Sequence, residues 1–455
     1  IKLEKVFLPV GLVFALMFLF LLPPESVPDE YDHMLEAYEN VNSIWGLDTE
    51  ENDTAFVYEE DIEALDVFEP TPTMLEFDEI KEHITDKGRS EGSDILDHTY
   101  MHSTAFSHLP GVIGILTARL LGLNGYLVWF FGRGVAIIFY LVMMYFAIRT
   151  APVAKAAFFM IALFPMTIQQ CCSYSYDGLI IEAACVLIAI FLKWIYCTDE
   201  RILKSEIFFL LYSCFILALI KGGCYMPLVL LALFIPNERF GDKKKTLIGK
   251  LSIVGITGAA WLIYTLGYVF YVLAPTGSEG TTLTYIDAEA YTVSDVLSDI
   301  WIFIVPAART VIDNCCQWVL SMFGTMLGWF DINVTSWVPI VMGVMILISL
   351  IPVRGQENVA VPGKWEKAAI VFFSLISIGL IFASMFLDWT PKGSDYIWGI
   401  QPRYFLPLLP AVMLLFRSRL VMIERDLSKY FAVISVSLYA MVFYDMLIEL
   451  QQYLE

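Results

Sequence analysis

The sequence lacks a cysteine framework. Its eight cysteines include two adjacent pairs, Cys171/Cys172 and Cys315/Cys316, and the other four sit in or beside apolar runs. None of these spacings is that of a zinc site. We therefore expect most of the cysteines to be small buried hydrophobic residues rather than metal ligands.

Positive charge is also scarce. The chain has 28 Lys and Arg against 48 Asp and Glu, a net charge of −20, so it has no basic footprint for nucleic acid. The acidity is local, because residues 23–105 contain 24 acidic and 3 basic residues, and the remainder is close to neutral. The excess charge therefore belongs to one segment outside the membrane.

Apolar residues dominate the rest of the chain. Of its 455 residues, 58% are hydrophobic, and the mean hydropathy is +0.67, which excludes an ordinary soluble globule. Apolar runs close to the roughly 20 residues that cross a bilayer recur along the chain. The pattern predicts an all-α polytopic membrane protein with about 11 transmembrane helices, near residues 6–22, 124–148, 156–173, 178–197, 206–221, 222–236, 247–273, 335–352, 366–387, 403–417 and 430–448.

The distribution of Lys and Arg predicts the orientation. A cytoplasmic N-terminus places 19 of the 28 Lys and Arg on the inner side, with the strongest marker at Lys243-Lys244-Lys245. The first apolar run, Val6–Leu22, follows two lysines as in a signal peptide. It continues into Pro23-Pro24 without a small-residue cleavage site, so we expect a retained anchor.

This orientation places two long loops on the extracytoplasmic side of a single membrane-embedded domain, 1–455. The first, 23–123, holds the acidic insertion and then an apolar segment expected to lie at the surface. The second, 274–334, contains a part-apolar stretch suited to surface helices. Its Leu327-Gly328-Trp329-Phe330-Asp331 cluster has aromatic side chains that suit either sugar stacking or the interfacial belt.

Six cations on the outer side lie in or next to apolar sequence, where an ionisable group requires a partner or a function. Lipid head groups or the phosphate of a lipid-linked substrate would suit them. They are Arg119, Arg133, Lys221, Arg309, Lys392 and Arg403.

The first candidate site directly follows the first apolar run, in Pro23-Pro24-Glu25-Ser26-Val27-Pro28-Asp29-Glu30-Tyr31-Asp32-His33. The prolines end the preceding helix. A new helix starting near Ser26 would put Asp29 and His33 on one face. Asp29 or Glu30 would then serve as a general base. Two other readings stay open: acids that favour the helix dipole, and a metal held by Asp29, His33 and Glu36.

Further candidates fall at the same side of the membrane. Asp177, in the Ser175-Tyr176-Asp177-Gly178 turn, is either a second carboxylate of the site or an N-cap. Arg403, with Gln401 and Tyr404 beside it, suits a phosphate. Lys221 precedes two glycines that permit close approach of a ligand. For both cations the alternative is snorkelling to lipid head groups.

Four stretches together resemble a known family. The first two are Pro23-Pro24 through Pro28-Asp29-Glu30 and His33, and then His108-Leu109-Pro110 through Arg119-Leu120-Leu121-Gly122. The third is Ser175-Tyr176-Asp177-Gly178, and the fourth is Gln401 through Arg403-Tyr404-Phe405-Leu406-Pro407 to Pro410. In this order they resemble an uncharacterised bacterial multi-spanning membrane protein family related to the type C (GT-C) glycosyltransferases. The acidic insertion between about Trp45 and Asp97 departs from that pattern.

The resemblance implies an inverting transfer of a sugar from a polyprenyl-phosphate donor to a cell-wall or surface glycan, on the outer face of the bacterial plasma membrane. It implies Asp29 as the leading base and Glu30 as the second, with His33 and Asp177 auxiliary. Arg403, Lys221, Tyr404 and Gln401 would bind the donor phosphate. A divalent cation, Mg²⁺ or Mn²⁺, assists some type C enzymes and stays open here.

A transporter or flippase of a lipid-linked glycan is the alternative function. Such a protein is expected to carry inverted repeats and polar sites near the membrane midplane. The sequence shows no convincing repeat, and its polar candidates gather toward one face. This favours the enzyme.

Overall fold

The computed structural model describes residues 1–47, 54–68, 74–86, 92–97, 106–272, 288–353 and 360–452. These parts of the chain are mostly helical, and six helices are long and apolar enough to cross a membrane. The six are α1 (Leu3–Leu21), α6 (Gly125–Thr150), α9 (Asp177–Tyr196), α11 (Lys243–Val272), α15 (Lys364–Asp388) and α17 (Ser428–Gln452).

The remaining elements are shorter or lie crosswise. The α-helices are α2 (Glu30–Trp45), α3 (Glu59–Leu65), α4 (Met74–His83), α5 (Leu109–Leu121), α7 (Lys155–Ala162), α8 (Pro165–Cys171), α10 (Lys204–Leu219), α12 (Val293–Ser298), α13 (Trp301–Phe323), α14 (Trp337–Ser349) and α16 (Leu409–Val412). The 3₁₀ segments are η1 (Lys221–Gly223), η2 (Met226–Phe234), η3 (Pro402–Leu408) and η4 (Met413–Phe416). The strands are β1 (Thr54–Tyr58), β2 (Ser93–Asp97), β3 (Met326–Leu327) and β4 (Ile332–Asn333).

Each of the other predicted spans contains helix, but in shorter pieces. Residues 156–173 divide into α7 and α8, where Pro165 begins a new helix. Residues 403–417 fall in η3, α16 and η4, which together run from Pro402 to Phe416 and carry three prolines. Length and composition thus support six crossings, and the number of 11 stays a prediction.

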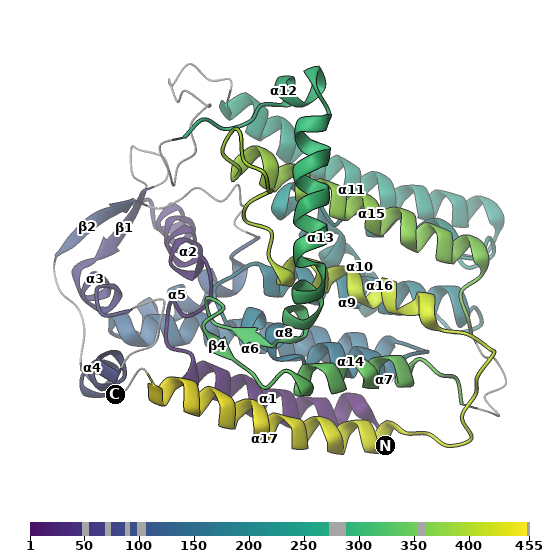
Figure 1. Ribbon diagram of the computed structural model, residues 1–455, viewed down its shortest axis with the longest axis horizontal. Coiled ribbons are helices and arrows are strands. Elements are labelled where there is room, and N and C mark those ends of the chain that lie inside the picture. Colours follow the sequence, from purple (N-terminus) through teal and green to yellow (C-terminus); the bar gives the residue numbers. More distant parts are fainter. Residues whose placement is uncertain are drawn as a thin grey trace.

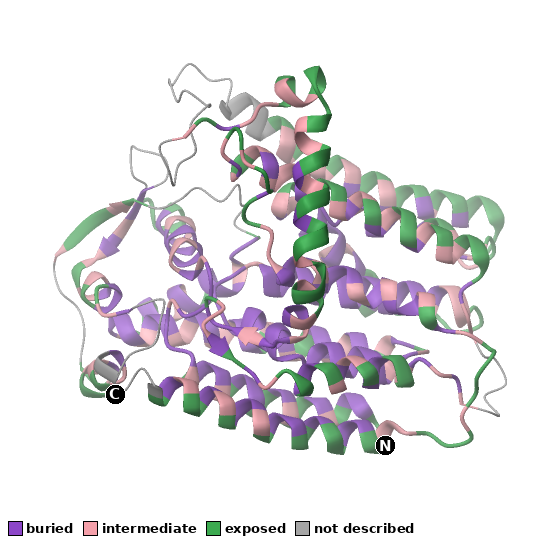
Figure 2. Ribbon diagram, in the orientation of Figure 1, coloured by how far each residue is buried: buried purple, intermediate pink, exposed green. Residues whose placement is uncertain are grey.

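The long apolar helices run roughly side by side, as Figure 1 shows. Helix α13 runs across them, and α2, α3 and the β1–β2 pair lie together at one end. The buried residues concentrate in the middle of the molecule (Figure 2), where α9 is the most enclosed of the six candidate spans. Helices α11, α13, α15 and α17 carry exposed large apolar side chains, such as Ile263, Ile312, Leu375 and Val433, which suit a lipid environment.

The chain leaves α1 through the predicted proline break, but the next helix starts later than expected. Helix α2 begins at Glu30, not near Ser26, and Asp29 precedes it in the left-handed region with φ 64°. The residue before a proline avoids the helical region, so Pro28 disfavours helical backbone at Val27 and a helix that starts near Ser26. Asp29 therefore lies at the N-terminal end of α2 rather than on its face, with its carbonyl accepting a hydrogen bond from the His33 amide at 3.1 Å.

The acidic insertion is anchored where it is described. Strands β1 and β2 pair antiparallel, with Thr54 opposite Asp97. Arg119 of α5 forms ion pairs with Asp61 and with Glu60, and its Nη2 donates to the hydroxyl of Tyr38 at 3.0 Å. These contacts fasten α3 to α5 and α2, so part of the insertion is folded onto the helical body.

All six cations expected to need partners form ion pairs with carboxylates. Three of these six sets of ion pairs join parts of the chain far apart in sequence and outside the site described below: Arg119 with Asp61 and Glu60, Arg309 with Asp395, and Lys392 with Glu289 and Asp295. The other three involve Arg133, Lys221 and Arg403.

Candidate functional site

Arg403 is the centre of a buried ionic cluster. Its Nη2 lies 2.6 Å from Asp29 Oδ2, and its Nε lies 2.7 Å from Asp177 Oδ2. Lys221 Nζ lies 2.5 Å from the other carboxylate oxygen of Asp177. The cluster thus joins the start of α2, the start of α9, η1 and η3, which are up to 374 residues apart in sequence.

The side chains of this cluster differ in their exposure to solvent. The side chain of Asp29 is 26% exposed, whereas those of Arg403 and Asp177 are 2% and 5% exposed. Asp29 is also one of five non-glycine residues with positive φ among the described residues, a conformation that costs free energy and concentrates at functional sites. Asp29 is therefore the more accessible of the two carboxylates in this cluster.

Three buried polar atoms near or beside the cluster have no hydrogen-bond partner within the described residues. They are Arg403 Nη1, Lys221 Nζ and Gln401 Oε1. The Lys221 ammonium is paired with Asp177 in charge but not in hydrogen-bond geometry, and it lies 3.5 Å from the centroid of the Tyr404 ring. Since buried polar groups are normally satisfied, unused donors on two cations suit an anionic ligand.

His33 lies in a group of aromatic side chains next to the cluster. Its Nδ1 lies 2.9 Å from His108 Nε2, and its ring packs edge-on against Tyr176 at 4.4 Å between centroids. Burial lowers the pKa of His33 to about 3, with Arg403 and Lys221 acting in the same direction and Asp177 opposing them. His33 is thus uncharged at neutral pH, and one ring nitrogen of this histidine pair donates to the other.

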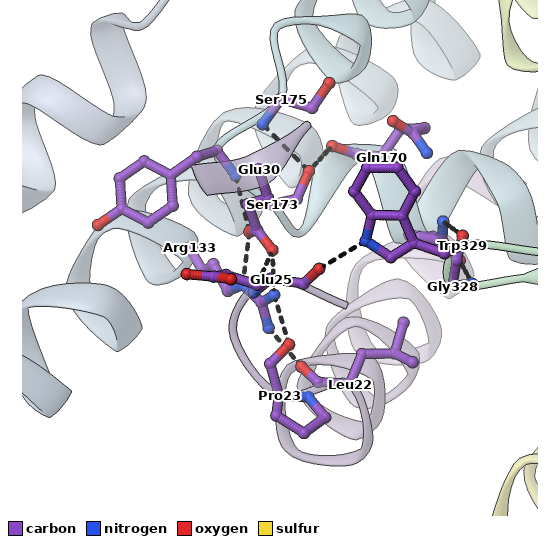
Figure 3. Close-up of polar contacts among 12 residues, drawn as sticks. Leu22, Pro23, Glu25, Glu30, Arg133, Gln170, Ser173, Ser175, Gly328 and Trp329 are labelled. Atoms are coloured by element: carbon purple, nitrogen blue, oxygen red, sulfur yellow. Dashed lines mark hydrogen bonds and ion pairs between the residues drawn. The ribbon is translucent and has the colours of Figure 1, made fainter. Parts of the chain in front are cut away.

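Glu30 lies in a separate network, shown in Figure 3. Its carboxylate receives two bonds from Arg133, from Nε at 2.8 Å and from Nη2 at 2.5 Å, and a third from the backbone amide of Tyr174 at 3.1 Å. Arg133 also donates to the carbonyls of Leu22 and Pro23. This network fixes the end of α1 to α6 and to the turn before α9, so it holds the segment that carries Asp29.

Two members of the ionic cluster that pair with each other, Asp177 and Lys221, lie at the start of a helix and in a tight turn. Asp177 opens α9 without capping it, because its two carboxylate oxygens face Arg403 and Lys221. Lys221 lies in the predicted tight turn, where Gly222 and Gly223 have φ of 58° and 76°. Only residues tolerant of positive φ form such a turn readily.

The hypothesis of a metal at Asp29, His33 and Glu36 finds no ligand set to support it. Within the described residues, no group of three or more His, Cys, Asp and Glu side chains is arranged to hold a metal ion. The two carboxylates of the cluster face a guanidinium and an ammonium group instead.

The structure brings together Asp29, His33, Asp177, Lys221, Arg403 and Tyr404, and it assigns Glu30 to the neighbouring network. His108, Tyr176 and Tyr174 enter the site region without having been predicted to belong to it. His108 and Tyr176 occur in stretches that carry the family resemblance, and this was the sequence signal that could have assigned them to the site. Arg133 was expected to need a partner, but nothing in its spacing pointed to Glu30.

The set of long apolar helices is that of a multi-spanning membrane protein, and the ionic cluster lies at the start of one of them, α9. The chain belongs to DUF2142, a family of predicted membrane proteins whose model matches residues 12–412. All four stretches that carry the resemblance lie within this range. None of the curated proteins and none of the solved structures compared with the chain matches it.

Proposed function

We propose that this chain is a membrane glycosyltransferase that moves a sugar from a polyprenyl-phosphate donor to a glycan acceptor outside the cytoplasm. The observation that carries the proposal is the accessible carboxylate of Asp29, paired with Arg403 in a cluster whose two cations, Arg403 and Lys221, have unused buried donors. Transfer from a sugar phosphate requires both a base for the acceptor and positive charge for the departing phosphate.

The reaction is a single displacement. An acceptor hydroxyl attacks the anomeric carbon, its proton moves to Asp29, and the bond from that carbon to the phosphate oxygen breaks. The configuration at the anomeric carbon inverts, and polyprenyl phosphate leaves with the bonding electron pair. Holding the two substrates in line supplies a large part of the rate enhancement.

Arg403 and Lys221 act on the phosphate. The unused Nη1 of Arg403 and the ammonium of Lys221 donate to phosphate oxygens as negative charge grows. Because Arg403 also binds Asp29 Oδ2 in the free protein, a phosphate that draws the guanidinium away frees this oxygen to accept the proton. Tyr404 supports Lys221 through its ring, and Gln401 offers an amide at the start of η3.

The proposal includes the type C fold, 11 crossings and an active site on the extracytoplasmic face of a bacterial plasma membrane. The family match and the six candidate spans support the membrane assignment. The clustering of Asp29, Asp177, Lys221 and Arg403 supports their location on one side.

The test uses the purified chain in nanodiscs with a panel of radiolabelled polyprenyl-phosphate sugars and crude cell-wall acceptor. We expect label to move from one of these lipids to the glycan fraction, with free polyprenyl phosphate as the second product. Absence of transfer with every donor, together with movement of a lipid-linked glycan across proteoliposome membranes, would refute the proposal in favour of a flippase.

One observation favours the flippase. Glu182 is buried within α9, and its Oε2 has no hydrogen-bond partner among the described residues. It borders a small cavity of about 10 Å³, close to the space of one water molecule, together with Gln170 and Ser173. An ionisable residue at such a position often lies on a transport path.

The variant Glu182→Gln separates the two functions. An enzyme that uses Asp29 keeps its transfer activity in this variant, because Glu182 takes no part in the displacement. Loss of proteoliposome translocation in Glu182→Gln, with no transfer in the unmodified protein, is the pattern that a flippase would give.

A further inference from the structure

A second site lies beside the hairpin formed by β3 and β4. A cavity of about 650 Å³ opens between the end of α13, this hairpin, the start of α14 and the C-terminal part of α17. Its volume is in the range of ligand-binding pockets. We call it the hairpin cavity.

The polar groups that line the hairpin cavity are carboxylates and amides, which are able to form hydrogen bonds with sugar hydroxyls. Asp445 and Glu449, one helical turn apart on α17, supply carboxylate oxygens, and Gln317 and Asn333 supply amides. Asp445 Oδ2 accepts a hydrogen bond from the backbone amide of Thr335 at 2.8 Å, which fixes this carboxylate in the wall. Apolar residues such as Leu320 and Ile448 complete the lining and suit the carbon faces of sugar rings.

Charge decides which glycan fits. The described residues that line the cavity include two carboxylates and no lysine or arginine. An anionic polymer would be repelled there, whereas neutral hydroxyl groups donate to carboxylates without a charge penalty. This is the opposite of the Arg403–Lys221 cluster, which suits a phosphate.

The hairpin connects the cavity to the Asp29 segment. Met326 and Asn333 of the hairpin line the cavity, while Trp329 at its tip donates from Nε1 to the carbonyl of Glu25 at 2.9 Å (Figure 3). Gly328 next to it donates to the side-chain oxygen of Gln169 at 2.9 Å. Trp329 is 42% exposed, so its aromatic ring is accessible beside Glu25, in the segment that leads to Asp29.

We infer that the hairpin cavity binds the glycan acceptor, and that this acceptor is a neutral, hydroxyl-rich chain whose reactive end passes Trp329 toward Asp29. This inference rests on the proposed function for the role of the bound glycan, but the binding itself is measured without any donor lipid.

Two adjacent cysteines of α13 supply the assay. Both thiols are exposed, but Cys316 lines the cavity and Cys315 is not among its lining residues. In the full chain in nanodiscs, Cys315→Ala leaves Cys316 as the reporter, and Cys316→Ala leaves Cys315 as the matched control. The rate of alkylation by N-ethylmaleimide is measured by mass spectrometry with a β-linked N-acetylglucosamine hexamer, maltohexaose or hexagalacturonate.

We expect at least one neutral hexasaccharide to slow the alkylation of Cys316, by about tenfold at ten times its Kd, and to leave Cys315 unchanged. Hexagalacturonate should protect neither thiol. Glu449→Lys should weaken protection by the neutral glycan, and Glu449→Gln should retain most of it. The inference would be overturned if hexagalacturonate protected Cys316 equally well, or if neither neutral glycan protected a thiol. Protection by added lipid alone would also overturn it.

The two proposals fail separately. Protection of Cys316 without sugar transfer from any donor would contradict the proposed function and keep the glycan site. Transfer to neutral glycan without protection of Cys316 would contradict the hairpin cavity as the acceptor site and keep the enzyme.

Discussion

At the scale of single residues, two neighbouring acids occupy different environments. Asp29 is partly exposed and contacts a cation of the ionic cluster, whereas the Glu30 side chain is fully buried and receives two bonds from Arg133. The residues alone left the choice of base between these adjacent carboxylates open, and the family resemblance implied Asp29 first and Glu30 second. Their surroundings assign Glu30 to holding the segment and leave Asp29 for the chemistry we propose.

Glu30→Gln should therefore destabilise the protein. The substitution leaves Arg133 buried without a compensating charge, a change that typically costs about 3–5 kcal/mol. Thermal unfolding in detergent should show a clear drop in Tm, while Asp29→Asn, at a partly exposed site, should cause a smaller one. A Glu30→Gln protein with unchanged Tm but no transfer activity would instead place Glu30 in the reaction.

His33 should make stability fall in mild acid. Its folded-state pKa of about 3 lies below its ordinary value of 6.5, so the unfolded chain binds the proton first. Its contribution is complete above pH 6.5 and decreases by about 1.4 kcal/mol for each pH unit below it. Tm measured between pH 7.5 and 5.5 should decline, and His33→Asn should flatten the decline.

His83 provides the control for this pH series. It is exposed, and its hydrogen bond to Asp86 raises its pKa, so its charged form contributes stability that is lost only as pH rises. His83→Asn should leave the acid decline in place. An identical decline in the His33→Asn protein would contradict the role assigned to the buried imidazole.

At the scale of elements, close packing of α5 on α6 holds the turn before α9. A Cβ atom on Gly114 would lie 2.4 Å from the Cα of Gly132, and one on Gly132 would lie 2.0 Å from the Tyr174 hydroxyl. The Tyr174 hydroxyl donates to the carbonyl of Val128 at 3.0 Å, and its backbone amide binds Glu30. These two glycines therefore permit the approach that places Tyr174.

Gly132→Ala should displace Tyr174, whose hydroxyl would lie 2.0 Å from the added Cβ atom. Overpacking of this kind costs about 1–3 kcal/mol, and Tm should fall accordingly. Gly134→Ala is the matched control, because nothing lies within 4 Å of the added Cβ on the same helix. Since alanine favours helix over glycine by about 1 kcal/mol, Gly134→Ala should be neutral or stabilising. Equal effects of both substitutions would contradict this account.

Local patterns in the sequence predicted much of the helical arrangement, but not the partners within the site. The apolar runs marked each of the long helices, and the glycines after Lys221 marked a real turn. Arg133 and Glu30 are 103 residues apart, and His33 and His108 are 75 apart. Such pairs form only when helices pack, so periodicity and spacing cannot identify them. The predicted start of α2 near Ser26 was wrong, because the positions of the prolines do not reveal that the Asp29 backbone adopts the left-handed conformation.

At the scale of the whole molecule, the orientation in the membrane is testable with the native cysteines. Cys315 and Cys316 are exposed on α13, Cys197 at the end of α9 is partly exposed, and the remaining five are buried. The predicted orientation places α13 outside and Cys197 inside. A membrane-impermeant maleimide applied to spheroplasts should label the α13 pair and spare Cys197 until the cells are lysed. Labelling of Cys197 first would reverse the orientation.

The central claim is that Asp29 removes the proton from an acceptor hydroxyl. Its most direct test compares the unmodified protein with Asp29→Asn in nanodiscs, measuring both binding of a radiolabelled polyprenyl-phosphate sugar and its transfer to glycan. We expect the variant to bind the donor and to lose transfer by about 100-fold or more, the usual contribution of a general base. Transfer at the rate of the unmodified protein would contradict the account and remove Asp29 from the chemistry.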